Sequence, residues 1–259
     1  MKLHVLGALS GTEPFKDLHH TSWVVELENG HLYWFDAGEN CSHTAYLMGL
    51  DLFNIQALFI SHPHYDHMAG LLNVFSTYAK MHYLVAVDAD TERSFDLYMP
   101  VAGLWETFES LTRQLRAYPP ATTVRPHVAC DGGCFENDEI KIEFRGNMHM
   151  PLTEDGKHQA FSFRISAEGK TVVASGDCKS PDEFLDWSKN CDLQLMESGH
   201  HHPWEVCRFW KEQQCNINKI LFMHHGRDVL YLPTESKIRS QRAWGKEVLF
   251  ARNGMTIEV

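Results

Sequence analysis

The stretch Leu-Phe-Ile-Ser-His-Pro-His-Tyr-Asp-His-Met-Ala-Gly, residues 58–70, decides the fold and much of the chemistry. It joins a short apolar run, typical of a buried strand, to an amphipathic pattern typical of a helix. The alternate spacing of His62 and His64 places both side chains on one side of an extended turn. Asp66 and His67 begin the helix and face a second position nearby.

Imidazole nitrogens and a carboxylate are ligands that suit Zn²⁺, and they also accept Fe or Mn. The whole chain is rich in such ligands, since 17 of its 259 residues are histidine. Because ligand type alone does not choose among these metals, availability decides which one is bound. The sequence therefore predicts a divalent metal site, with Zn²⁺ as the first candidate and Mn²⁺ or Fe as alternatives.

The remaining composition is that of an ordinary globular protein, with 44% hydrophobic and 22% charged residues. One α/β domain can hold a chain of this length, so we expect a single domain over residues 1–259. The formal charge of −11 argues against a general nucleic-acid coat protein, because phosphate binding relies on Lys and Arg. We therefore expect no stable nucleic-acid partner. The oligomeric state is open, with a homodimer as one option.

The seven cysteines include no CxxC pair, and no apolar run approaches the roughly 18 residues that a bilayer span needs. The first residues of the chain are too polar for a signal peptide and predict a strand instead. We expect a cytoplasmic protein with reduced thiols and no association with membranes.

Short β-prone runs and helical patterns follow one another along the chain. Strand pairs come early and strand–helix alternation comes later, which indicates sheets covered by helices. Between residues 88 and 127 we expect a helical insert. The expected strands are Leu3–Leu6, Trp23–Leu27, Leu32–Phe35, Ala57–Ile60, Tyr83–Val87, Ile140–Phe144, Phe161–Ile165, Thr171–Ala174, Leu193–Met196, Lys219–Met223 and Glu247–Ala251. The expected helices are Met68–Lys80, Val101–Ala117, Glu205–Gln214 and Thr234–Trp244.

Several of the expected strands end in a residue that can bind a metal or orient a ligand. In α/β sheets, ligands collect beyond the carboxyl ends of strands, where loops are free to converge. Polar groups on several strand ends are therefore what one buried, oriented site requires. The residues in these positions are Asp36, Ser61 with His62, Asp177, Glu197 and His224.

Residues 58–70 resemble the signature of the metallo-β-lactamase-fold hydrolases. The rest of the chain follows the order of that family's motifs, from about residue 3 to residue 259. The resemblance implies a four-layer αββα sandwich of the α/β (α+β) class, with two mixed β-sheets, helices on the outside and the site at one edge. The matching segments are Trp34–Gly38, Asn147–Pro151, Ala174–Asp177, Leu221–His224 and Phe250–Val259.

The family's ligand positions, carried over to this sequence, imply a centre with two divalent metal ions. Seven candidate ligands also exceed the four of one tetrahedral site. Two such ions share a carboxylate and lower the pKa of bound water to about 7, so that hydroxide serves as the nucleophile. The resemblance assigns His62, His64 and His149 to the first ion, Asp66, His67 and His224 to the second, and Asp177 to both.

The remaining polar residues of the motifs have less certain roles. His224 and His225 compete for the last ligand position, and an expected strand end at Met223 favours His224. Asp36 is expected to orient a ligand, because metal-bound histidine usually donates its other N–H to a carboxylate or carbonyl. The further candidates are Asp66, His200 and His202 as catalytic residues, and Glu197, His20 and His225 beside the ligands or the substrate.

Departures within the superfamily narrow the expected reaction. The β-lactamases usually carry cysteine at the position of Asp177 and are exported, and the diiron flavoproteins carry glutamate at the position of His64. The remaining pattern is similar to the ribonuclease Z and cyclic-phosphodiesterase branch, although no exosite arm for tRNA is recognisable. This resemblance implies a dinuclear metal-dependent hydrolase of phosphodiester bonds, acting on a small-molecule or nucleotide-like phosphodiester substrate. Ester, lactone or thioester hydrolysis is the alternative reaction, and an inactive metal-binding or sensing domain is the alternative outside enzymes.

Overall fold

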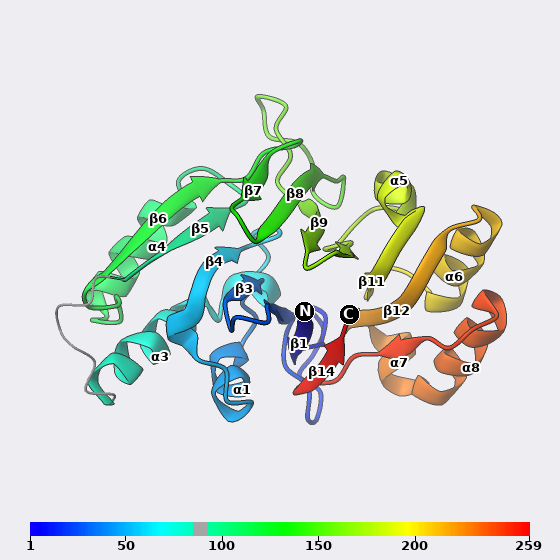
Figure 1. The fold of residues 1–259 in the computed structure, drawn as a ribbon, viewed down its shortest axis with the longest axis horizontal. Coiled ribbons are helices and arrows are strands. Elements are labelled where there is room, and N and C mark those ends of the chain that lie inside the picture. Colours follow the sequence, from blue (N-terminus) through cyan, green and yellow to red (C-terminus); the bar gives the residue numbers. More distant parts are fainter. Residues whose placement is uncertain (85–92) are drawn as a thin grey trace.

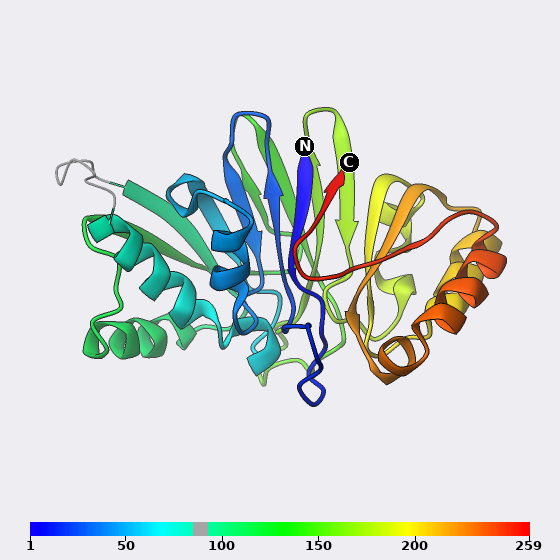
Figure 2. The ribbon, with the colours of Figure 1, turned by 90° about the horizontal axis from the view of Figure 1, so that it is seen from below.

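Two β-sheets pack face to face at the centre of the molecule, and helices cover both outer faces (Figure 2). A computed structural model describes residues 1–84 and 93–259. The layers follow the order α/β/β/α, which confirms the expected αββα sandwich. Within the part of the chain that the structure describes, none of the helices combines the length and the apolar character that crossing a bilayer requires.

The first sheet begins with an antiparallel group and continues with parallel strands. β1 pairs antiparallel with β14 and β2, β2 pairs antiparallel with β3, and the pairs from β3 to β6 are parallel. In spatial order its described strands are β14 (Met255–Glu258), β1 (Lys2–Gly7), β2 (Ser22–Glu26), β3 (Leu32–Phe35), β4 (Ile55–Phe59), β5 (Arg93–Met99) and β6 (Thr122–Val128).

The second sheet is built in the same mixed way. Its strands from β7 to β10 pair antiparallel, and those from β10 to β13 pair parallel. In spatial order its described strands are β13 (Leu249–Phe250), β12 (Asn216–His225), β11 (Asn190–Ser198), β10 (Lys170–Ala174), β9 (Phe161–Ala167), β8 (Ile140–Gly146) and β7 (Cys134–Glu136).

Each outer face carries its own set of helices (Figure 1). The first sheet is covered by α1 (Cys41–Leu47), α3 (Leu71–Leu84) and α4 (Leu104–Gln114). The second sheet is covered by α5 (Leu185–Ser188), α6 (Pro203–Glu212) and α8 (Pro233–Trp244). The short helices are η1 (Leu52–Asn54), α2 (Tyr65–Met68), η2 (Pro181–Phe184) and α7 (Arg227–Tyr231).

The inner strands β1 to β4 of the first sheet are buried on both faces, which explains their continuous apolar runs. In β3, Tyr33 and Phe35 face the space between the sheets, whereas Leu32 and Trp34 face the helices. Between the sheets, the ring of Phe59 lies with its centroid 5.0 Å from that of Phe35. The ring of Phe59 also contacts Phe144 of the second sheet, with centroids 5.8 Å apart, so aromatic side chains join the two sheets.

Two expectations about secondary structure are wrong. Helix α3 continues through Tyr83 and Leu84, where we expected a strand, and residues 85–87 of that strand lie outside the described residues. The described part of 88–127 contributes β5 and β6 to the first sheet, with α4 between them, and is not a helical insert. Charged side chains conceal these strands in the sequence, because Arg125 on the outermost strand pairs with Asp96 of β5 at 2.6 Å.

We expect Phe59→Ala to lower the free energy of unfolding by about 3–5 kcal/mol, because it removes a fully buried ring from the contact between the sheets. Urea denaturation measures this loss. Tyr46→Ala is the matched control, since the side chain of Tyr46 on α1 is 57% exposed and its loss costs within about 0.5 kcal/mol. Equal effects of the two substitutions would contradict the central position given to Phe59.

Candidate metal centre

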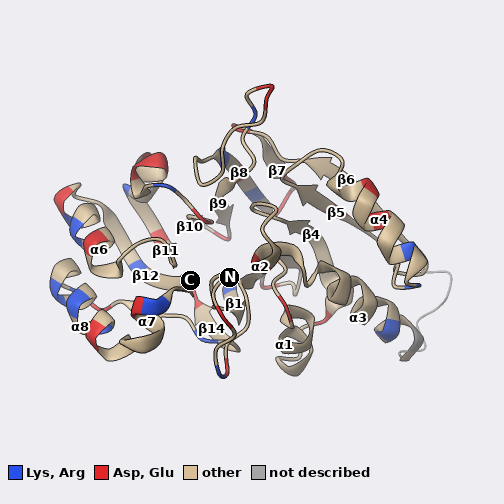
Figure 3. Ribbon diagram, turned by 180° about the vertical axis from the view of Figure 1, so that it is seen from behind, with Lys and Arg blue, Asp and Glu red and all other residues tan. Residues whose placement is uncertain are grey.

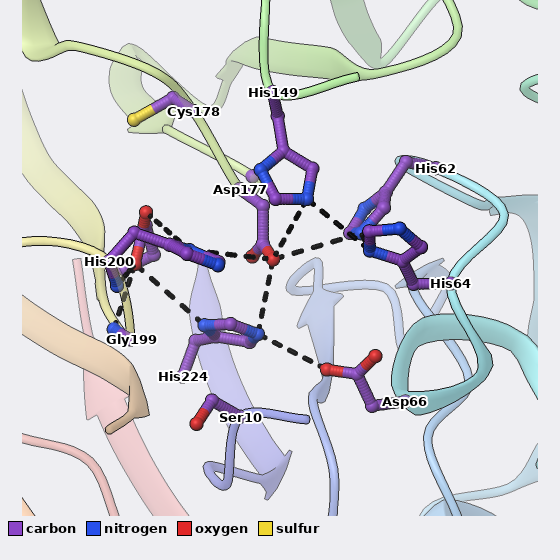
Figure 4. Close-up of polar contacts among 12 residues, drawn as sticks. Ser10, His62, His64, Asp66, His149, Asp177, Cys178, Gly199, His200 and His224 are labelled. Atoms are coloured by element: carbon purple, nitrogen blue, oxygen red, sulfur yellow. Dashed lines mark hydrogen bonds and ion pairs between the residues drawn. The ribbon is translucent and has the colours of Figure 1, made fainter. Parts of the chain in front are cut away.

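The predicted polar residues meet at one edge of the sandwich (Figure 4). Asp36 follows β3, the HxHxDH segment follows β4, and Asp177 follows β10. Glu197 and His224 are each the last residue but one of their strands, β11 and β12. His149 lies in the loop after β8. Because the parallel strands β3, β4, β10, β11 and β12 end at this edge, residues that are up to 188 positions apart in the sequence become neighbours.

The first group of donor atoms comes from His62, His64, His149 and Asp177. Nε2 of His62 lies 3.0 Å from Nδ1 of His64, which in turn lies 3.3 Å from Nε2 of His149. Oδ2 of Asp177 lies 3.7 Å from Nε2 of both His62 and His149. Ligand nitrogens of one tetrahedral zinc ion lie about 3.3 Å apart, given Zn–N bonds of about 2.0–2.1 Å. The spacing of these four side chains therefore fits the ligands of one metal ion.

The second group comes from Asp66, His67, His224 and again Asp177. Oδ2 of Asp66 lies 3.3 Å from Nε2 of His224 and 3.5 Å from Nε2 of His67. Oδ1 of Asp177 lies 3.4 Å from Nε2 of His67, and its Oδ2 lies 3.3 Å from Nε2 of His224. The Asp177 carboxylate thus contacts both groups of donor atoms.

Two atoms of the second group are buried without a hydrogen-bond partner among the described residues, namely Nε2 of His67 and Oδ1 of Asp177. A buried polar atom without a partner costs about 1–3 kcal/mol. Both atoms face the same space, and a divalent cation between them would satisfy both. The donor atoms, their spacing and these unpartnered atoms all fit bound divalent metal ions.

Asp36 holds one of these histidines from behind. Its Oδ2 accepts a hydrogen bond from Nδ1 of His67 at 2.8 Å, and its Oδ1 accepts one from the backbone N–H of Ser61 at 2.7 Å. With the proton on Nδ1, Nε2 of His67 presents its lone pair to the metal position. This contact places Asp36 where the orienting role expected of it would act. Ser61, whose Oγ also donates to Asp36, belongs to the same support, and sequence reasoning did not assign it a role.

A bulge near the end of β12 separates the roles of His224 and His225. The strand extends to His225 and does not end at Met223 as expected, and its pairing with β11 shifts at this point. His224 takes a left-handed backbone conformation, φ 50°, that directs its side chain to the donor atoms. His225 is buried behind it, where Nε2 donates to the carbonyl of Ala251 at 3.0 Å.

Glu197 and His200 lie beside the two groups of donor atoms. Glu197 is buried, and Oε2 accepts hydrogen bonds from the backbone N–H groups of Gly199 and His200. Its Oε1 lies 3.1 Å from Nδ1 of His200, and the same nitrogen lies 3.8 Å from Oδ2 of Asp177. Sequence reasoning therefore placed both residues at the site, although it could not tell His200 from its neighbours.

Two other expected residues lie away from the donor atoms. Nδ1 of His202 contacts Asp228 at 2.5 Å, and its ring stacks on Trp204, so it does not face the centre. His20 is buried under Tyr65, with ring centroids 5.1 Å apart. The run of three histidines hid these differences, because side-chain directions in a loop do not follow a sequence period.

The histidines and carboxylates of the centre shift one another's pKa values. Burial lowers the pKa of His224, but the charge of Asp177 and the contacts with Asp66 and Glu197 raise it to about 9. Burial and the neighbouring histidines lower the pKa of His62 well below its ordinary value. Burial raises the pKa of Asp66, but the hydrogen bond with His224 and the charges of His67 and His224 together lower it below its ordinary value. The carboxylates are therefore ionised, as metal ligands must be.

A family model described as the metallo-beta-lactamase superfamily matches residues 16–224. The chain belongs to this superfamily. It is 27% identical over 175 residues to a ribonuclease Z of Nostoc punctiforme, an alignment that covers 66% of this chain and 48% of the relative. The chain thus spans about half the length of the curated relatives it matches. The expected resemblance to this superfamily and to its ribonuclease Z branch is confirmed.

Solved structures of the superfamily share the fold over the whole chain. The metallo-beta-lactamase fold protein YhfI from Bacillus subtilis aligns with a TM-score of 0.76 and 19% identity, covering 100% of this chain and 99% of that one. The short form of human tRNase Z aligns with a TM-score of 0.73, 19% identity and the same coverage. Because the sequence identities are this low, these structures support the fold alone and do not indicate a substrate.

These relatives contradict the expectation of no stable nucleic-acid partner, because a ribonuclease by its name acts on RNA. The expectation rested on the net charge of −11. Net charge averages over the whole surface, however, and an enzyme needs favourable charge only where the phosphate groups lie.

The cavity above the donor atoms is lined partly by residues to which the sequence analysis gave no individual role. This cavity has a volume of about 310 Å³, and Tyr65 and the segment Ser10–Thr12 line it beside the histidines and Asp66. The segment Ser10–Thr12 lies in the loop after β1 and carries no motif that marks it. Figure 4 shows Ser10 below His224 and Asp66.

We expect Asp36→Asn to weaken metal binding by about 10–100-fold, because the amide no longer fixes the tautomer of His67 as a carboxylate does. Competition with a chromophoric chelator measures the affinity. Asp51→Asn is the control, since Asp51 is an exposed carboxylate that only caps η1. Unchanged affinity in Asp36→Asn would show that the contact between Asp36 and His67 does not support a metal ligand.

Proposed function

We propose that this chain is a metal-dependent hydrolase that cleaves phosphodiester bonds with two divalent metal ions, Zn²⁺ being the first candidate. The observation that carries the proposal is the Asp177 carboxylate, which contacts both groups of donor atoms. His62, His64 and His149 would hold one ion, and Asp66, His67 and His224 the other. Bound ions of this kind supply a water molecule of lowered pKa and stabilise the charge that develops on phosphate oxygens.

His200 is the residue that we propose donates the proton to the leaving oxygen. Its Nδ1 contacts Glu197, and this contact raises the pKa of His200, so that the imidazolium form persists toward neutral pH. Its ring lines the cavity, with a centroid 4.9 Å from that of His149. Glu197 acts through His200 by holding the orientation and the charge of the ring.

RNA is the substrate class that we propose, in line with the names of the curated relatives. A groove of about 1040 Å³ begins behind the centre at His225 and carries Lys16, Lys237 and Arg252 among its lining residues. Residues 219–259 hold seven Lys and Arg against four Asp and Glu, several of them on α7 and α8 (Figure 3). Cations along a groove attract the phosphate backbone of a nucleic acid.

We expect the Zn²⁺-loaded protein to cleave RNA and bis(p-nitrophenyl) phosphate, but neither a lactone nor a thioester. His64→Ala removes a ligand of the first ion, so we expect loss of metal and at least a 100-fold loss of turnover, with an unchanged circular dichroism spectrum. His43→Ala is the matched control, because His43 is an exposed histidine on α1.

Three outcomes of this assay would contradict the proposal. Turnover of the acyl substrates alone would assign the site to ester or thioester hydrolysis. A fully metal-loaded protein that turns over none of the substrates would be a metal-binding domain. A fully active His64→Ala variant would remove His64 from the centre.

We expect His200→Ala to lower kcat on RNA by about 10²–10⁴-fold while the metal content stays unchanged. The loss on bis(p-nitrophenyl) phosphate is expected to be much smaller, because p-nitrophenolate leaves without a proton. His202→Ala is the control, since His202 faces Asp228 and not the centre. Equal losses on both substrates would contradict proton donation by His200 and indicate a role in binding.

A further inference from the structure

A second cluster of metal-ligating side chains lies next to the proposed centre. Cys178, Glu197 and His201 each direct one ligand atom to a common point, and the three atoms lie within 4.8 Å of one another. Cys178 and Glu197 are each 2% exposed, and the side chain of His201 is 17% exposed. Figure 4 shows the sulfur of Cys178 pointing away from the carboxylate of Asp177, although the two residues are adjacent in the sequence.

The distances in this cluster suit a zinc ion. Nε2 of His201 lies 3.5 Å from Sγ of Cys178 and 3.5 Å from Oε1 of Glu197. Zn–S bonds of about 2.3 Å and Zn–N or Zn–O bonds of about 2.0–2.2 Å place tetrahedral ligand atoms about 3.3–3.6 Å apart. A thiolate, a carboxylate and a neutral imidazole together carry two negative charges, which balance a divalent cation. Thiolate favours soft cations, so Zn²⁺ and Cd²⁺ fit better than Mg²⁺ or Mn²⁺.

A competing hydrogen bond makes this cluster a weaker site than the proposed centre. Nε2 of His201 lies 3.0 Å from the backbone carbonyl of Cys178, to which it donates its proton. Before the same nitrogen binds a cation, the imidazole must move its proton to Nδ1 and give up this bond, and the thiol must release its proton to solvent. The cluster therefore fills only after the stronger ligand groups have taken their ions.

We propose that Cys178, Glu197 and His201 form a further metal site that binds Zn²⁺ or a similar soft divalent cation and inhibits the enzyme. Oε1 of Glu197 is the atom shared between this site and His200, whose Nδ1 it contacts at 3.1 Å. A cation bound to Oε1 competes with His200 for the carboxylate and weakens the support of the proposed proton donor. The inhibition rests on the proposed function, whereas the binding of the cation does not.

Equilibrium dialysis against Cd²⁺, followed by the ultraviolet absorption of the Cd–thiolate bond, tests the site directly. The wild-type chain is expected to bind one ion more than Cys178→Ser, with a thiolate absorption that the variant lacks. Cys215→Ser is the matched control, because Cys215 lies outside the cluster, and it is expected to behave as the wild type. His201→Gln removes another ligand of the site and is expected to lose the same ion, so the test does not depend on one variant folding.

Inhibition by excess Zn²⁺ gives the second readout. Wild type and Cys215→Ser are expected to lose activity as Zn²⁺ rises, whereas Cys178→Ser needs at least about tenfold more Zn²⁺ for the same loss, which corresponds to about 1.4 kcal/mol of binding. Equal ion numbers and equal absorption in the wild type and Cys178→Ser would overturn the site. Loss of the extra ion without a change in inhibition would overturn the inhibitory role.

The two proposals fail in different ways. A chain that binds the extra ion through Cys178 but cleaves no phosphodiester would contradict the proposed function and keep the site. A chain that cleaves phosphodiesters but binds no ion through Cys178 would support the proposed function and contradict the further metal site.

Discussion

The arrangement of this molecule depends on the burial of the Asp177 carboxylate, which is 3% exposed and faces imidazoles instead of Lys or Arg. Burying an ionised carboxylate is costly unless positive charge compensates it. His67 and His224 supply part of that charge when they are protonated, as their raised pKa values indicate. Divalent cations compensate the carboxylate more completely, because the imidazoles then act as neutral ligands. Metal affinity and the ionisation of this cluster are therefore two aspects of one electrostatic requirement.

The sandwich meets this requirement through the position of its strand ends. Parallel strands in both sheets end at the same edge, where the loops after β3, β4 and β10 and the last residues of β11 and β12 provide polar side chains. Two of the candidate ligands are oriented by local features other than regular strand geometry. The bulge at His224 turns its side chain toward the donor atoms, and the hydrogen bond with Asp36 orients the ring of His67. Gly199 permits this packing, since a Cβ atom there would lie 2.6 Å from Nδ1 of His224.

The sequence predicts the parts of the structure whose pattern is local. The HxHxDH segment, the apolar runs of the inner strands and the amphipathic helices α3, α4, α6 and α8 all appear close to where their periodicity placed them. The strands β5 and β6 were missed because salt bridges between their charged side chains replace the usual apolar pattern. The different side-chain directions of His200 and His202 could not be predicted from the sequence either. They depend on tertiary contacts with Glu197 and Asp228, respectively. The net charge of the chain led to the wrong expectation about a nucleic-acid partner. A net charge does not show where cations lie, such as Lys16 and Lys237 in the groove.

The donor atoms come from both halves of the sandwich. His62, Asp66 and His67 belong to the first sheet, whereas His149, Asp177 and His224 belong to the second. Ions bound at this edge would therefore link the two sheets. The edge lies at the end of the interface opposite the hairpin that joins β2 to β3. Chelation would loosen the sandwich from this edge inward, so the enzyme's resistance to proteases would depend on its metal supply.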